Sequence, residues 1–229
     1  MGWQVSGTAS IFRKLLTCAL ASAWNQASGI NFVVSYGAVI INSIGTINPD
    51  IANLALYCAA LPVIMTCQYL FERVGRRKCV MASMVGIGLI DIVDGGIGLG
   101  PKTTGFNNGA VAMFFLFYLV FNLGIGGGTW VSLAEINTGN NRSRLMSIST
   151  ASVWIFAWLV SFTFPYLYNP DSANLGPKIG FIYGSLMLVG SVWVYFFLPE
   201  TAGRSLEEID EMFRLGVPAR KFVGEYLNG

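Results

Sequence analysis

Four polar side chains lie close together inside an apolar stretch near the start of the sequence. Residues 15–42 include no charged residue, yet the middle of this run contains Asn25, Gln26, Ser28 and Asn31. Each carboxamide carries a hydrogen-bond donor and an acceptor, and polar side chains at membrane depth are candidates for the lining of a substrate pathway. The same groups also join neighbouring membrane helices by hydrogen bonds. The four residues by themselves favour neither interpretation.

No residue pattern predicts covalent catalysis or a metal centre. The sequence has no histidine, and its four cysteines, Cys18, Cys58, Cys67 and Cys79, lack the paired spacing of a metal site or a disulfide framework. Paired catalytic acids and a nucleophile with its base are also missing from the pattern. We therefore expect a protein that is not an enzyme, uses no cofactor and acts by non-covalent binding.

The composition predicts an all-α membrane protein. Apolar residues make up 54% of the chain and charged residues 11%, whereas soluble domains average about 25% charged. Only helical bundles and closed barrels span membranes, and long apolar runs without alternation favour helices. The lipid bilayer is thus an expected partner. A net charge of +2 is too small to predict binding to nucleic acid.

Six uncharged or nearly uncharged runs are long enough to cross a bilayer, which takes about 20 residues. They cover residues 15–42, 51–71, 79–100, 108–134, 145–168 and 179–198. We expect a lead-in at 1–14, a six-helix transmembrane bundle at 15–198 and a tail at 199–229. In the tail, Ser205 and Glu208 have the spacing of a capping box, which predicts a short helix with Leu206, Ile209 and Phe213 on its apolar face.

The basic residues predict the orientation in the membrane. Twelve of the 14 lysines and arginines fall in the termini and in the loops on one side of the six expected spans. Only Lys102 and Lys178 fall on the other side. Because basic residues gather on the cytoplasmic side, we expect both termini to be cytoplasmic.

Four segments together resemble one known family. They are 25–31 (NQASGIN), 72–77 (ERVGRR), Ala134-Glu135 with Arg142, and 199–209 (PETAGRSLEEI). In this order and spacing they are similar to the motifs of the sugar porters of the major facilitator superfamily, in the second half of that fold. Such carriers have two six-helix halves with the substrate between them. The resemblance implies a C-terminal half that is either a fragment or works with a separate N-terminal six-helix half.

The resemblance also implies a site for a sugar or a polyol-like small molecule. The substrate-binding residues would be Asn25, Gln26, Asn31, Tyr36, Phe121, Asn122, Trp130 and Trp154. The carboxamides of residues 25, 26 and 31 match positions that bind sugar hydroxyls, and Tyr36 matches an outer gate. The aromatic residues match positions whose ring faces pack on a sugar.

Three departures from the family pattern argue against tight glucose binding. The family places two prolines before the tryptophan of its tenth helix, where this sequence has Gly127 and Thr129. Asparagines of the family correspond to Ala60 and Val153. A buried hydroxyl left without a partner costs about 1–3 kcal/mol. Another polyol, a pentose, a disaccharide or a quinate-like acid therefore stays among the expected substrates.

Six charged residues match an inner gate in the family: Glu72, Arg76, Arg77, Glu135, Arg142 and Glu200. The resemblance implies a network of ion pairs that closes the cytoplasmic side and breaks as the halves rock. The simpler interpretation is that these charges only mark the cytoplasmic ends of the helices.

Asp91 and Asp94 lie within a predicted span and three residues apart, so they share one helix face. Carboxylates at membrane depth are candidates for function. In the resembling family, however, the corresponding helix lies at the periphery, so we expect both side chains to point outward or to be a product of relaxed selection.

Taken together, these features predict transport of a sugar or related polyhydroxy compound by alternating access, in the plasma membrane. The alternatives are a transport-inactive remnant and a nutrient sensor with the carrier fold. Sensors of this kind usually have a long cytoplasmic tail, and the sequence ends at Gly229. We therefore expect a carrier rather than a sensor.

Overall fold

The structure of the chain, a computed structural model, describes residues 7–31, 33–34, 48–101, 103–139, 141–168 and 173–222. Every regular element in this described part is helical. The elements are α1 (Gly7–Gln26), α3 (Pro49–Arg73), α4 (Arg76–Gly98), α5 (Thr104–Leu123), α6 (Ile125–Ile136), α7 (Arg142–Tyr168), η1 (Gly176–Lys178), α8 (Ile179–Phe197), α9 (Leu206–Arg214) and η2 (Ala219–Lys221).

Five stretches of the described residues are long and apolar enough to cross a membrane. They are Asp50–Arg73, Arg76–Gly98, Asn108–Ile136, Arg142–Tyr168 and Gly176–Phe197. These stretches confirm an all-helical fold with membrane-length helices. The remaining predicted span, 15–42, corresponds to α1 and the residues after it, and residues 35–47 lie outside the described part. Six spans and the orientation of the termini stay predictions.

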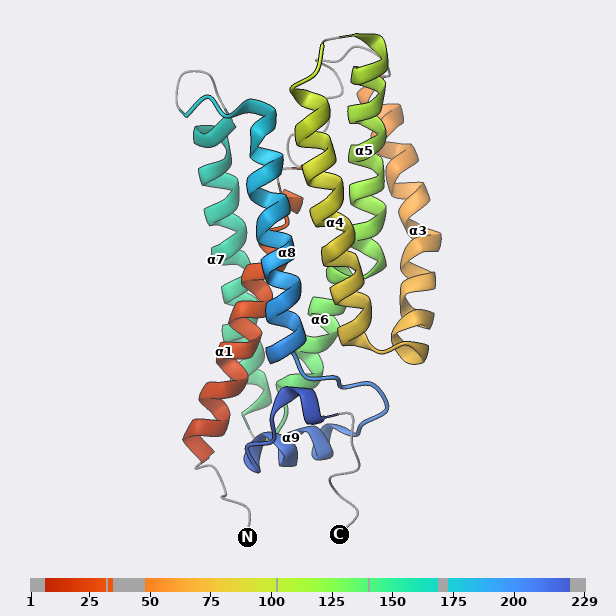
Figure 1. Ribbon diagram of the computed structural model, residues 1–229. Helices are drawn as coiled ribbons and strands as arrows, with labels where there is room; N and C mark the ends of the chain where they lie inside the picture. Colours follow the sequence, from red (N-terminus) through yellow and green to blue (C-terminus); the bar gives the residue numbers. More distant parts are fainter. Residues whose placement is uncertain are drawn as a thin grey trace.

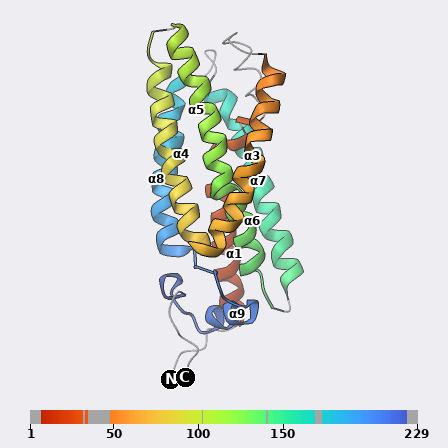
Figure 2. The same ribbon diagram turned by 90° about the vertical axis from the view of Figure 1, so that its right-hand side faces the viewer.

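The long helices run side by side along one axis (Figures 1 and 2). In Figure 1, α4 and α8 lie at the centre, α1 and α7 on one side, and α5 and α3 on the other. The start of α1, the α3–α4 connection, the start of α7 and the short helix α9 lie at the same end. We call this the tail end. The α4–α5 connection and η1 lie at the opposite end, which we call the far end.

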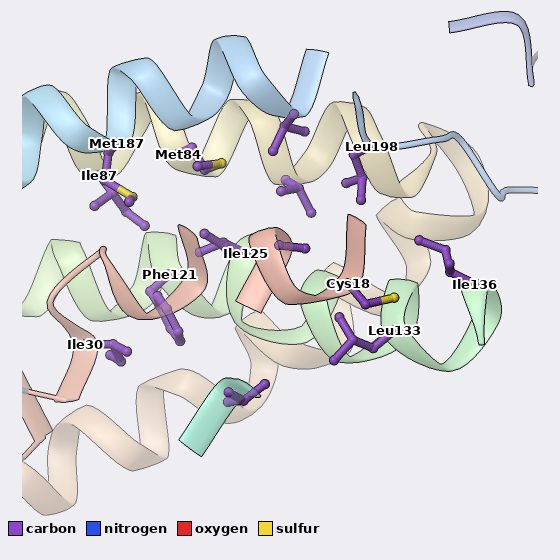
Figure 3. Close-up of a cluster of buried hydrophobic side chains, with 14 of the residues drawn as sticks. Cys18, Ile30, Met84, Ile87, Phe121, Ile125, Leu133, Ile136, Met187 and Leu198 are labelled. Carbon is purple, nitrogen blue, oxygen red and sulfur yellow. The ribbon is translucent and has the colours of Figure 1, made fainter. Parts of the chain in front are cut away.

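A continuous apolar core lies between the central helices (Figure 3). Met84 and Ile87, three residues apart on α4, face Met187 of α8, and none of the three has exposed surface. Ile125 and Leu133 of α6 extend the same cluster, with 1% and 0% of their surfaces exposed. Spacing of three to four residues places such side chains on one helix face, which is why α4 is the helix around which the others pack.

The backbones of α4 and α8 touch through glycines. A Cβ atom added at Gly184 would lie 2.7 Å from the carbonyl oxygen of Gly88, and one at Gly180 would lie 2.4 Å from that of Asp91. Both distances are too short for a real side chain. Small residues of this kind let membrane helices approach closely, which increases their packing contacts without any need for polar groups.

The predicted tail helix is present as α9. The Ser205 hydroxyl accepts a hydrogen bond from the Glu208 backbone amide (3.2 Å), and the Glu208 carboxylate accepts one from the Ser205 amide (3.1 Å), which completes the predicted capping box. Ile209 and Phe213 are buried as expected, whereas Leu206 is 36% exposed. Phe213 packs edge-on against the Phe222 ring beyond η2. The described tail is therefore a packed part of the bundle.

Candidate functional site

The polar motif lies where the first helix is interrupted. Helix α1 ends at Gln26, and the chain turns through residues 27–29 before helical geometry resumes at Ile30. Gly29 has a φ of +78°, a conformation that favours glycine. The Ser28 hydroxyl donates to the Asn25 carbonyl oxygen (2.7 Å), which occupies an acceptor that the helix end leaves free. The sequence predicted one uninterrupted run here and did not locate this break.

The three carboxamides of the motif form a chain of hydrogen bonds. Asn31 Nδ2 donates to Gln26 Oε1 (2.6 Å), and Gln26 Nε2 donates to Asn25 Oδ1 (3.2 Å). Asn25 Nδ2 in turn donates to the carbonyl oxygen of Ile125 (3.0 Å) and to the Thr129 hydroxyl (3.1 Å), both on α6. Asn25 and Gln26 are 4% and 6% exposed. The motif is therefore a hydrogen-bonded link between the end of α1 and α6.

A second helix break faces the first. Gly124 separates α5 from α6, and the Ser83 hydroxyl of α4 accepts a hydrogen bond from the Ile125 amide (3.0 Å) at the new helix start. A Cβ atom at Gly124 would lie 2.4 Å from Ser83 Cβ and 2.5 Å from the Cys79 carbonyl oxygen. Close contact with α4 and a side-chain acceptor thus stabilise a bend that has no proline.

The other predicted substrate residues occupy different environments. Phe121 is only 9% exposed and stacks on Phe117 within the core, with ring centroids 6.4 Å apart. Asn122 is partly buried, and its Nδ2 donates to the Tyr118 carbonyl oxygen of its own helix (2.8 Å). Trp130 and Trp154 are 41% and 68% exposed. Tyr36 lies outside the described residues.

At the tail end, the structure joins four of the six predicted gate residues. Both carboxylate oxygens of Glu200 accept hydrogen bonds from the first backbone amides of α4, those of Arg76 (2.9 Å) and Arg77 (3.1 Å). The Arg76 guanidinium pairs with Glu135 of α6 (3.0 Å), which also accepts a hydrogen bond from Thr201. The Arg77 guanidinium donates to a backbone carbonyl near the end of α8. Thr201 belongs to this network, although the sequence analysis did not select it.

The remaining two predicted gate residues are not part of this network. Glu72 and Arg142 are exposed, and neither takes part in an ion pair among the described residues. They lie at the end of α3 and at the start of α7, on the same end of the bundle.

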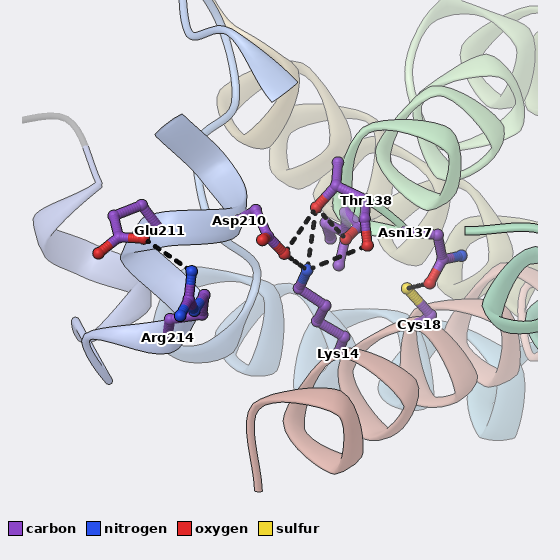
Figure 4. A network of polar contacts seen from close by, with 8 residues as sticks. Lys14, Cys18, Asn137, Thr138, Asp210, Glu211 and Arg214 are labelled. Atoms are coloured by element: carbon purple, nitrogen blue, oxygen red, sulfur yellow. Dashed lines mark hydrogen bonds and ion pairs between the residues drawn. The ribbon is translucent and has the colours of Figure 1, made fainter. Parts of the chain in front are cut away.

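Sequence reasoning missed a second polar cluster between α1 and α9 (Figure 4). Lys14 is 2% exposed, and its ammonium forms an ion pair with Asp210 and donates to the Thr138 hydroxyl (2.9 Å). Arg13 beside it donates to the Val217 carbonyl oxygen (2.6 Å). Both basic residues were interpreted only as markers of orientation. The negative charge of Asp210 inside the predicted amphipathic helix was the available signal for a partner.

A cavity of about 380 Å³ lies in the far half of the bundle. Among the described residues, it contacts the motif only at Ser28 and Gly29, and none of the predicted substrate residues in this part of the chain lines it. Asp91 and Asp94 of α4 do line it. The expectation that these carboxylates point outward was therefore wrong, because the face of α4 that carries them packs toward α5 and α8.

A bundle of membrane-length helices, two of them interrupted beside a polar motif, is the architecture of a multi-pass membrane protein. Residues 3–213 match the family described as "Sugar (and other) transporter". The chain belongs to this family, within the major facilitator superfamily.

Individual relatives agree with this membership. The high glucose sensor RGT2 of Saccharomyces cerevisiae is 33% identical over 204 residues, which cover 88% of this chain and 27% of the sensor. The major facilitator-type transporter ecdD of Aspergillus rugulosus is 29% identical over 227 residues, which cover 93% of this chain and 42% of the transporter. The chain thus spans less than half the length of these relatives.

Solved structures show the same fold. The proton:xylose symporter XylE bound to 6-bromo-6-deoxy-D-glucose superposes with a TM-score of 0.80 at 20% identity, over 91% of this chain and 45% of that one. The inward-open XylE of E. coli gives a TM-score of 0.71 at 22% identity, over 91% and 43%.

Proposed function

We propose that this chain forms the C-terminal six-helix half of a carrier for a sugar or a related polyhydroxy compound. In this proposal the substrate binds between this half and an N-terminal half, and crosses the plasma membrane by alternating access without covalent chemistry. Membership of the sugar transporter family and the membrane-length helices support it. Both termini would lie in the cytoplasm, in keeping with the basic residues at the tail end.

The observation that carries the proposal is the carboxamide chain of Asn31, Gln26 and Asn25 beside two helix breaks. A sugar hydroxyl is both a donor and an acceptor, so it can replace the Asn31–Gln26 hydrogen bond with one bond to each residue. Because Asn25 is bonded to α6, such a replacement would act directly on the segment beside the Gly124 break. Interrupted helices near the substrate are typical of transporters.

The exposed indoles of Trp130 and Trp154 would face the substrate or the N-terminal half, and Phe121 would support them from the core. Asn122 would become available when its hydrogen bond to the backbone opens. At the tail end, the Arg76–Glu135 pair and Glu200 would act as the inner gate. Several such contacts must act together, since an exposed pair contributes only about 0–1 kcal/mol.

The test is uptake of labelled hexoses, pentoses, disaccharides and quinate by a transporter-null yeast. The chain would be expressed alone and together with six further spans, if the reading frame upstream of Met1 encodes them. We expect uptake of at least one compound in the second case. Gln26→Ala should raise KM about tenfold through loss of a hydroxyl partner, whereas Gln68→Ala, an exposed glutamine on α3, should leave KM unchanged. A complete absence of uptake for all of these compounds would contradict the proposed carrier function.

A sensor is the second candidate, because one relative at 33% identity is described as a high glucose sensor. Binding of a sugar to the purified protein without any uptake would favour this function. If the protein shows no binding and no uptake, the result would favour a transport-inactive remnant.

A further inference from the structure

Two carboxylates that line the far-half cavity each have one buried oxygen without a hydrogen-bond partner among the described residues. Asp91 Oδ2 and Asp94 Oδ1 are buried, and no described residue donates a hydrogen bond to either atom. Both residues line the cavity of about 380 Å³. A buried acceptor without a donor is rare in folded proteins and calls for a ligand or an unusual environment. In a membrane bundle the cost is larger, because lipid supplies no donor.

The surroundings provide no compensating charge. None of the ion pairs formed by the described residues includes Asp91 or Asp94. The basic residue at this end in the described part, Lys178, is exposed. The other titratable groups that line the cavity in the described part of the chain are the phenols of Tyr183 on α8, which interacts electrostatically with Asp91, and of Tyr168 on α7. Two nearby carboxylates without a cation are unfavourable in a low-dielectric site, and a positively charged ligand would remove that cost.

The rest of the lining identifies the kind of cation. The lining includes six aromatic side chains from α5, α7 and α8: Phe106, Phe114, Phe117, Phe164, Tyr168 and Tyr183. Aromatic faces attract ammonium groups and also bury apolar surface. A metal ion would need more ligands, and no group of three histidine, cysteine or acidic residues occurs in the described part of the chain. The volume lies in the range of about 300–1,000 Å³ that is usual for small-molecule sites.

We propose that this cavity binds a small organic cation, an ammonium group attached to an apolar body. The ammonium lies between Asp91 and Asp94, and the apolar body packs against Phe114 and Phe117. The site is separate from the carboxamide chain, and its wall meets the polar motif only at Ser28 and Gly29.

Part of the cavity wall lies at the far end of the bundle. Gly100, Pro101 and Phe106, from the α4–α5 connection and the start of α5, line the cavity there. This end is opposite the tail end (Figure 1). With both termini in the cytoplasm, the ligand would enter from the outer side of the membrane.

The first experiment compares two probes of nearly the same shape. Tritiated benzylamine binding is measured on the chain in lipid nanodiscs at neutral pH, with empty nanodiscs to subtract partitioning into lipid. Unlabelled benzylamine competes as a cation, and benzyl alcohol competes as its neutral counterpart. We expect saturable binding that benzylamine displaces at least about tenfold better than benzyl alcohol, since charged contacts are the stronger ones. No saturable binding at millimolar concentrations, or equal competition by the alcohol, would overturn the proposal.

Substitutions then test whether benzylamine binds in this cavity. Asp91→Asn with Asp94→Asn keeps the side-chain size and removes both charges, and should weaken benzylamine binding at least about tenfold. Asp50→Asn is the matched control, because Asp50 is exposed at the start of α3 and outside the cavity. Ala110→Phe adds bulk to the cavity wall and should abolish binding, which tests the site even if the double variant does not fold. Unchanged affinity in Ala110→Phe would overturn the proposal. Sugar uptake is a separate readout, so the outcome does not depend on the carrier function.

Discussion

Glu200 stabilises the start of a helix with a charge that the sequence analysis assigned to a gate. Its two oxygens accept hydrogen bonds from the first two amides of α4. These amides have no partner within the helix, and the helix dipole favours a negative charge there. Gly75, just before them, has a φ of +102°, and a Cβ atom at this residue would lie 2.5 Å from Glu200 Oε2. The glycine therefore makes room for the carboxylate.

Glu200→Ala should lower the free energy of unfolding by about 1–3 kcal/mol, because two partly buried amides lose a charged acceptor. Glu200→Gln keeps one acceptor oxygen and should cost less. The measurement is denaturant unfolding of the detergent-solubilised chain. Glu207→Ala is the control, since Glu207 is exposed in the first turn of α9. Equal losses in Glu200→Ala and Glu207→Ala would show that the capping bonds contribute nothing.

At the scale of elements, the break after α1 and the break between α5 and α6 determine which polar groups come into contact. The α5–α6 break depends on Gly124, which touches α4, and on the Ser83 hydroxyl, which accepts from the Ile125 amide. Gly127, three residues later, has no such contact, because the nearest atom to its added Cβ is 3.7 Å away. Gly124 therefore has a close contact with α4 that Gly127 lacks, a difference that the sequence alone does not show.

Gly124→Ala should destabilise the fold by about 1–3 kcal/mol, as expected for an extra carbon in a closely packed contact. Gly127→Ala should change the stability by no more than about 0.5 kcal/mol. Both values come from the same unfolding titration. If the two substitutions cost the same, the close contact between Gly124 and α4 would not be what stabilises the bend.

Much of this architecture was predictable from local patterns. Five of the six spans predicted from apolar runs are membrane-length helices in the described part of the chain, and the spacing of Ser205 and Glu208 predicted α9. The breaks at Gly29 and Gly124 were not predicted, because they depend on which neighbouring helix approaches closely. For the same reason the sequence grouped Asn25 and Gln26 but did not show that α6 is their hydrogen-bond partner.

The sequence also did not show which neighbouring elements the charged side chains on a helix would meet. Asp91 and Asp94 share a face by spacing, yet only the packing of α4 shows that this face borders a cavity. Lys14 fits a pattern of orientation markers equally well whether it is exposed or buried. Its 2% exposure depends on α9, which lies almost two hundred residues away in the sequence.

At the scale of the whole molecule, the tail holds the start of α1 to the bundle. The Lys14–Asp210 pair crosses this contact, with side chains 3% and 30% exposed. A double-mutant cycle with Lys14→Met and Asp210→Asn should give a coupling of about 1–3 kcal/mol in the free energy of unfolding. The Arg214–Glu211 pair of α9, 60% and 41% exposed, should give about 0–0.5 kcal/mol in its own cycle. Equal couplings would mean that burial adds nothing to the first pair.

The glycine contact between α4 and α8 leaves no room for a side chain between the two backbones at Gly184 and Gly88. The tail end of this helix pair carries the arginines bonded to Glu200, and the far half carries Asp91 and Asp94. We therefore expect the two helices to move as one unit, so that a tilt at the tail end also moves the cavity wall. Larger side chains at these glycines should separate the two helices while leaving every charge in place.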